Sequence, residues 1–79
     1  MVSGRLVVMR SSSGASEDWG EFAFVALPSP GDRIMARRDG IENYATVLAI
    51  HHAPALAGSE DVPTIEVVAR WTGAGGKLR

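Results

Sequence analysis

The chain has 79 residues, of which 46% are hydrophobic and 22% charged, as expected for one small folded domain. Its net charge of −1 gives no overall field for binding a polyanion, and the absence of Cys excludes disulfides and thiolate metal sites. No apolar run reaches the roughly 20 residues of a membrane-spanning helix, so we expect no membrane segment.

The first predicted element is a short strand at residues 6–9, LVVM, which is rich in β-branched side chains and flanked by Arg5 and Arg10. These four apolar residues are fewer than the ~7–15 that form the apolar core of a signal peptide. We therefore expect a cytoplasmic protein.

Residues 11–20, SSSGASEDWG, have the composition of a loop. Ser16 is a good helix N-cap, which leaves open a single helical turn at this point. Trp19 has two interpretations. It folds back as a lid over one open end of the core, or it is an exposed anchor for a partner, since Trp is favoured at interface hot spots.

Residues 21–27, EFAFVAL, predict a second strand with apolar side chains on both faces. Such a strand is either covered on both sides or faces another subunit. Two prolines, Pro28 and Pro30, then predict a rigid turn before a third strand at residues 33–38. In that strand Ile34 and Ala36 share one face, and the other face is formed by Arg33, Met35 and Arg37.

Asp39-Gly40 is the strongest local signal, because an Asp-Gly pair between two strand-like runs favours a type I′ hairpin turn. A two-residue loop fixes the strand register by counting outward from the turn. The resulting pairs are Arg38 with Ile41, Arg37 with Glu42, Ala36 with Asn43, Met35 with Tyr44, and Ile34 with Ala45. Arg37 and Glu42 form a sensible exposed ion pair in this register.

Residues 44–50, YATVLAI, are apolar on both faces and predict the central strand of the sheet. Residues 53–63 form a predicted loop that is long for so small a domain. Residues 64–71 alternate clearly as a fifth strand, with Ile65, Val67, Ala69 and Trp71 inward. The glycine-rich residues 72–79 predict a flexible tail.

Five strands with turn signals between them, and no convincing long helix, predict a single all-β domain over residues 1–79. Closing the sheet hides its edges, so we expect a small five-stranded SH3-like or OB-like barrel, or a strongly bent sheet. The sequence does not distinguish the two barrel topologies.

Candidates for chemistry are few. His51 and His52 are adjacent in a strand, so their side chains point to opposite faces and are weak candidates for one metal site. The serines lie in loops without a patterned base, and turn or hairpin roles account for Asp32, Asp39 and Glu42. We therefore expect no enzymatic activity, no metal and no cofactor.

Two kinds of binding remain open. The two strands that are apolar on both faces favour an interaction or assembly module, self-associating as a homodimer, with another protein as a further possible partner. The candidate interaction residues are Trp19, Arg33, Met35, Arg37, Tyr44 and Arg70. The alternative is a nucleic-acid-binding barrel that uses Arg33, Arg37, Arg38 and Tyr44, because single-strand binders combine a basic groove with stacking aromatics.

The stretch at residues 27–54 runs LPSPGDRI, then Asp39-Gly40, then a strand ending in IHHAP. This order resembles a group of small uncharacterised bacterial all-β proteins, in which Leu-Pro-x-x-Gly-Asp-x-Ile precedes a hairpin and a hydrophobic strand ending in His. It covers about a third of the chain. The resemblance implies an all-β fold and carries no function with it.

Overall fold

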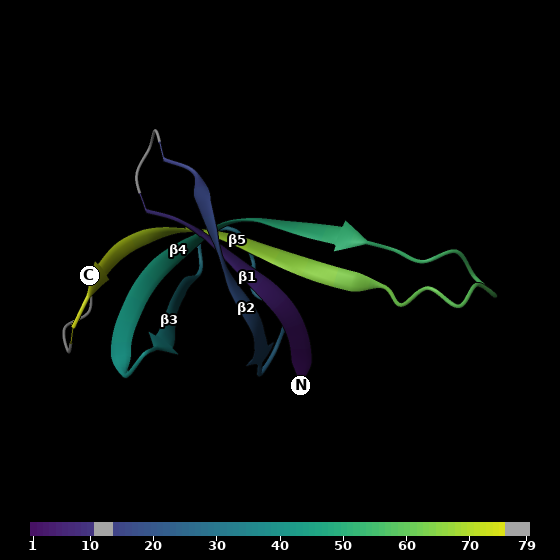
Figure 1. Ribbon diagram of the computed structural model, residues 1–79, viewed down its shortest axis with the longest axis horizontal. Coiled ribbons are helices and arrows are strands. Elements are labelled where there is room, and N and C mark those ends of the chain that lie inside the picture. Colours follow the sequence, from purple (N-terminus) through teal and green to yellow (C-terminus); the bar gives the residue numbers. More distant parts are fainter. Residues whose placement is uncertain (11–13, 76–79) are drawn as a thin grey trace.

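The computed structural model describes residues 1–10 and 14–75. In these residues all the regular secondary structure is β-strand. In chain order the strands are β1 (Val2–Met9), β2 (Ser16–Phe24), β3 (Arg33–Arg38), β4 (Ile41–Ala53) and β5 (Thr64–Ala74). They form one five-stranded sheet in the order β2-β1-β5-β4-β3, which curls into a half-barrel (Figure 1). The predictions of an all-β fold and of a strongly bent five-stranded sheet are confirmed.

The β3–β4 hairpin turns at Asp39 and Gly40, as predicted. Both residues have positive φ, 54° and 78°, as a type I′ turn requires. The observed register runs from Arg38 opposite Ile41 to Arg33 opposite Thr46, so each of the five predicted pairs is confirmed.

The core lies on the inner face of the curled sheet, where alternate residues of the strands are buried. Leu6, Val8, Val47, Val67 and Ala69 are each at most 1% exposed. Partly buried aromatic and aliphatic side chains pack around them: Phe22, Phe24, Ile34, Ile50, Ile65 and Trp71. The inward set predicted for the fifth strand is therefore confirmed. The remaining alternate residues form the outer face.

The prediction of a loop over residues 11–20 is wrong from Ser16 onward, where β2 begins, and the optional helical turn is wrong as well. Residues 11–13 lie outside the described chain. A β-bulge interrupts the alternation by which β2 could have been recognised in the sequence. Leu6 pairs with Gly20 and Val7 pairs with Asp18, so Trp19 is an extra residue in β2. Gly20 has the positive φ of 92° that accommodates this bend.

β2 ends at Phe24, so the predicted strand over residues 21–27 is too long at its end. Val25 is 93% exposed and Leu27 is 41% exposed. The backbone bends at residues 25 and 26, ahead of the rigid turn that Pro28 begins. This segment is therefore not a strand with two apolar faces, and one of the two sequence arguments for self-association fails.

The centre of the sheet is β5, not the predicted central strand at residues 44–50, which belongs to β4. β5 pairs in parallel with β1 from Arg5–Glu66 to Met9–Arg70, and antiparallel with β4 along its other side. It also continues to Ala74, so the prediction of a flexible tail from residue 72 is wrong for residues 72–74. Pairing with β4 orders these glycine-rich residues, and residues 76–79 lie outside the described chain.

One end of the β4–β5 hairpin projects from the sheet as a two-stranded ribbon (Figure 1). The pairing of β3 with β4 ends at Thr46, and the pairing of β1 with β5 begins only at Glu66. We call residues 48–66 the arm. Its loop covers residues 54–63, one residue shorter than predicted because Ala53 still belongs to β4. The molecule is 45 × 28 × 23 Å, and its radius of gyration of 13.4 Å exceeds the about 12 Å of a compact chain of this length.

Candidate functional site

The outer face of β3, β4 and β5 brings together five of the six predicted interaction residues. Arg33 pairs with Thr46, and Thr46 pairs in turn with Arg70, so the two arginines lie on one row across three strands. Met35 pairs with Tyr44 on the neighbouring row. We call this surface, formed by Arg33, Met35, Arg37, Tyr44 and Arg70, the outer basic face.

The charges of the outer basic face are only partly neutralised. Arg37 donates from Nη2 to Glu42 Oε2 over 2.9 Å, which confirms the predicted cross-strand ion pair. The Tyr44 hydroxyl donates to the other oxygen of Glu42 at 3.3 Å. Within the described chain, Arg33 and Arg70 are exposed and form no ion pair. These two guanidinium groups lie beside Met35, which has 45% of its surface exposed.

Arg38 does not join the outer basic face, because its side chain points to the inner side. Its guanidinium carbon lies 4.8 Å from the ring centre of Trp19, and its Nη1 is 3.6 Å from Glu17 Oε1. The four residues predicted for nucleic-acid binding therefore do not form one surface: Arg33, Arg37 and Tyr44 lie on one side of β3 and β4, and Arg38 on the other.

Trp19 is buried, with 8% of its surface exposed, and it packs in the core. The interpretation of Trp19 as an exposed anchor is wrong, and its position agrees with the lid interpretation. The β-bulge explains this position. Trp19 is the extra residue of the bulge, next to Gly20, and the bulge turns its indole toward the inner face.

Trp19 belongs to a cluster that ties the two edge strands β2 and β3 together through side chains. The guanidinium of Arg10 lies 5.7 Å from the Trp19 ring centre and 5.1 Å from that of Trp71. Trp19 Nε1 donates to Glu17 at 3.0 Å, and Trp71 Nε1 donates to Asn43 Oδ1 at 3.1 Å. We call Arg10, Glu17, Trp19, Arg38, Asn43 and Trp71 the tryptophan–arginine cluster.

Sequence reasoning missed most of this cluster. Arg10, Glu17 and Asn43 carry no motif, and their proximity depends on the curl of the sheet. One signal was available: a buried indole N–H requires an acceptor, and the chain has two Trp residues and few polar residues at inward positions. All six side chains are paired with one another, so the cluster is a closed structural unit.

Three carboxylates have lowered pKa values, and each has an identified cause. The indole N–H of Trp19 is the largest cause of the lowered pKa of Glu17, followed by the charge and hydrogen bond of Arg10 and the charge of Arg38. The backbone N–H of Gly20 is the largest cause of the lowered pKa of Asp18, followed by Arg5. Arg37, followed by Tyr44, lowers the pKa of Glu42. All three groups are therefore held in the charged form.

These shifts predict a loss of stability in acid. A lowered pKa in the folded state stabilises the fold above the ordinary pKa, 4.5 for Glu and 3.8 for Asp, and this stabilisation disappears as the pH falls through the lowered values. We expect the urea midpoint of unfolding to be flat from pH 7 to about pH 5 and to fall below about pH 4.5.

Glu17→Gln is the control for this pH dependence. It keeps an acceptor for the Trp19 indole and removes the titrating group, so the midpoint of the variant should fall less steeply in acid than that of the wild type. A wild-type midpoint that stays constant down to pH 2.5 would contradict the prediction.

The two histidines point to opposite sides of the arm. His51 Nδ1 lies 3.2 Å from Glu66 Oε1 on the outer face, and His52 pairs with Ile65 on the inner face. Across residues 1–10 and 14–75, no three His, Cys, Asp or Glu side chains are close enough together to hold a metal ion. The histidines therefore do not converge on one site.

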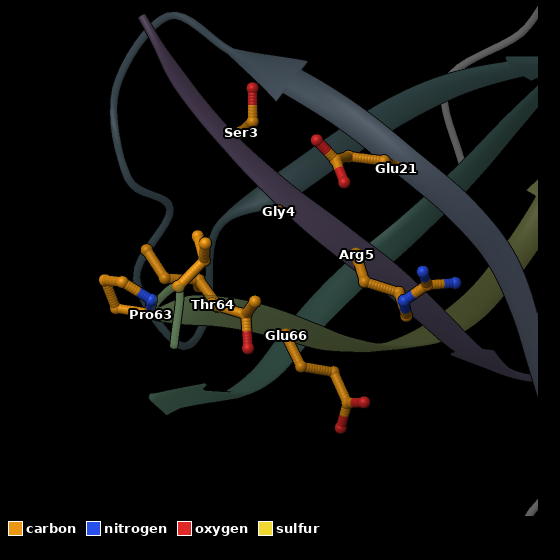
Figure 2. Close-up of a pocket in the computed structure, with 9 residues that line it drawn as sticks. Ser3, Gly4, Arg5, Glu21, Pro63, Thr64 and Glu66 are labelled. Atoms are coloured by element: carbon orange, nitrogen blue, oxygen red, sulfur yellow. The ribbon is translucent and has the colours of Figure 1, made fainter. Parts of the chain in front are cut away.

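An open groove of about 380 Å³ lies at the base of the arm, where β1 diverges from β5 (Figure 2). Arg5, Glu21 and Glu66 contribute its charges, and Arg5 already donates to Asp18 at 2.7 Å. A side chain at Gly4 would place its Cβ 3.3 Å from the carbonyl oxygen of Ile65. The backbones of β1 and β5 therefore lie close together at this point of the groove. It is a surface notch with mixed charges.

The tip of the arm has exposed apolar and acidic side chains that are close to one another in the sequence. Leu56 is 81% exposed and Val62 is 78% exposed, and Glu60 and Asp61 lie between them. A turn shapes this loop, in which the N–H of Ser59 donates to the carbonyl of Leu56 at 3.0 Å. The tip therefore presents an amphipathic surface at the far end of the ribbon.

The described part of the chain contains no helix that is long and apolar enough to span a membrane. No protein family, curated protein or solved structure matches the sequence or the fold.

Proposed function

We propose that this protein is a non-enzymatic interaction module that self-associates as a homodimer. The observation that carries this proposal is the arm, a two-stranded ribbon that projects from the half-barrel and exposes Leu56 and Val62 at its tip.

A two-stranded ribbon without a third strand or a covering layer is marginally stable in water. The pairing of β1 with β5 begins at Glu66, and the pairing of β3 with β4 ends at Thr46. From His52 and Ile65 to the tip, neither side of the arm therefore has a neighbouring strand. Contact with a second molecule would cover both the ribbon and its apolar tip. A chain of this size also has a thin core, which favours stabilisation by a partner subunit.

Structural roles account for the three carboxylates with shifted pKa values. The carboxylates with shifted pKa values, Glu17, Asp18 and Glu42, are each held ionised by an Arg and a further donor. A general acid at neutral pH needs the opposite shift, toward a higher pKa. These groups act as structural ion pairs.

Sedimentation velocity from low to high micromolar concentration tests self-association. We expect a concentration-dependent dimer for the wild type, and at least tenfold weaker association for the double variant Leu56→Ser, Val62→Ser. Both substituted residues are exposed, so the fold should be retained. Val25→Ser is the matched control, because Val25 is 93% exposed and lies outside the arm.

A wild type that remains monomeric at high micromolar concentration would contradict the proposal of self-association. The alternative function, binding of single-stranded nucleic acid, is favoured by Arg33 and Arg70, which lie on the row next to the one that holds Tyr44. A monomer that binds labelled single-stranded DNA at low salt, and loses it at high salt, would establish that alternative instead.

A further inference from the structure

We infer that the arm of one copy docks on the outer basic face of a second copy, and that the contact is reciprocal. This inference rests on the self-association proposed above and adds which two surfaces meet. It follows from the opposite charges of the arm and the face, from their exposed apolar residues, and from the direction in which the arm projects.

The arm is acidic. Residues 48–66 contain Glu60, Asp61 and Glu66 but no Lys or Arg, which gives this segment a charge of −3 with neutral histidines. The net charge of the whole chain is −1, so the rest of the molecule carries +2. Glu66 is paired with His51 at the base of the arm, and Glu60 and Asp61 are exposed at its tip.

The outer basic face complements this tip in charge and in polarity. Arg33 and Arg70 are exposed and form no ion pair within the described chain. They are two strands apart on one row, which places them roughly 10 Å from each other. Met35, 45% exposed, lies beside them and offers an apolar contact for Leu56 or Val62.

The same charges disfavour the other ways of covering these surfaces. Two arm tips brought together would oppose Glu60 and Asp61 with their own copies, and two outer basic faces would oppose Arg33 and Arg70. Like charges placed directly opposite each other are destabilising. Within one molecule the arm projects away from β3, so its tip does not lie over its own outer basic face (Figure 1).

The geometry allows the contact to be made twice. The β4 half of the ribbon, residues 48–53, spans roughly 20 Å, which is comparable with the 28 and 23 Å of the molecule's two shorter axes. An arm can therefore reach across a second copy. When two copies related by a two-fold axis each dock their arm on the outer basic face of the other, both tips and both faces are covered, as a closed dimer requires.

Charge reversal in sedimentation velocity experiments tests the inference. One variant carries Arg33→Glu and Arg70→Glu, and a second carries Glu60→Arg and Asp61→Arg. Each variant alone opposes like charges at both contacts, so we expect at least tenfold weaker association. Mixed in equal amounts, the two variants restore opposite charges at both contacts and should form a mixed dimer with near wild-type affinity.

Two controls complete the design. Glu21→Arg changes the charge of an exposed residue on β2, outside both surfaces, and should leave association unchanged. Wild-type association should weaken as salt rises from 20 to 500 mM, because exposed charges are screened. Circular dichroism of every variant confirms that the fold is retained.

The outcomes separate the two proposals. A wild-type dimer that is indifferent to both charge-reversal variants would overturn arm docking and leave self-association standing. A failure of the mixed variants to associate would also overturn it. A wild type that is monomeric throughout would remove self-association, and arm docking with it.

Discussion

Trp19→Ala should cost about 3–5 kcal/mol of unfolding free energy, the range observed when a buried Trp is truncated. Trp19 is 8% exposed, packs in the core and lies under the guanidinium groups of Arg10 and Arg38. A domain of 79 residues has a total stability of only roughly 4–12 kcal/mol. The substitution should therefore remove at least about a quarter of the total stability, read as a large drop of the urea midpoint at pH 7.

Trp19→Phe separates packing from hydrogen bonding at this position. It keeps an aromatic ring and removes the indole N–H that donates to Glu17 at 3.0 Å. We expect a smaller loss than for Trp19→Ala, and a pKa of Glu17 closer to 4.5, because that N–H is the largest cause of its lowering. A loss below about 1 kcal/mol for Trp19→Ala would contradict the position of this side chain in the core.

Leu6→Ala should cost about 2–5 kcal/mol, because it leaves a cavity that the surrounding strands cannot easily close. Leu6 is 1% exposed and pairs with Val67 on one side and with Gly20 on the other. Gly20 has no side chain to fill the vacated space. Urea unfolding, read as a shift of the midpoint at constant slope, measures the loss.

The neighbouring residue gives the matched control for Leu6. Val7 lies on the outer face and is only partly buried, so Val7→Ala should cost about 1 kcal/mol or less. Equal losses for the two variants would show that the inner and outer faces of β1 have been assigned wrongly.

The sequence predicts the β3–β4 hairpin correctly because its signals are local. Asp39-Gly40 requires positive φ, and the register follows by counting from that turn. Five of the six predicted interaction residues lie on one face for the same reason: strand periodicity places Arg33, Met35 and Arg37 together. The observed pairing of β4 with β5 adds Arg70 to the same row as Arg33.

The errors arise where a distant partner decides the structure. Polar residues and Gly20 made the start of β2 resemble a loop, and only pairing with β1 makes it a strand. The same pairing inserts the bulge that buries Trp19, which periodicity alone cannot indicate. The central position of β5 depends on β1, which is far from it in the sequence, and the arm exists because the pairing with β1 stops at Glu66.

The parallel pairing of β1 with β5 also has a consequence for the order of folding. The β1–β2 and β3–β4 hairpins can each close locally, but in the described chain only β5 joins them into one sheet. Joining β1 to β5 therefore closes a loop over most of the chain, while the other three pairings link strands that are consecutive in the sequence. Because the entropy of that closure is lost before the distant contacts form, we expect the β1–β5 pairing to be the slow step of folding. Until β5 is in place, the inner faces of both hairpins and the edges that β5 pairs with remain uncovered, and uncovered strand edges are where chains aggregate.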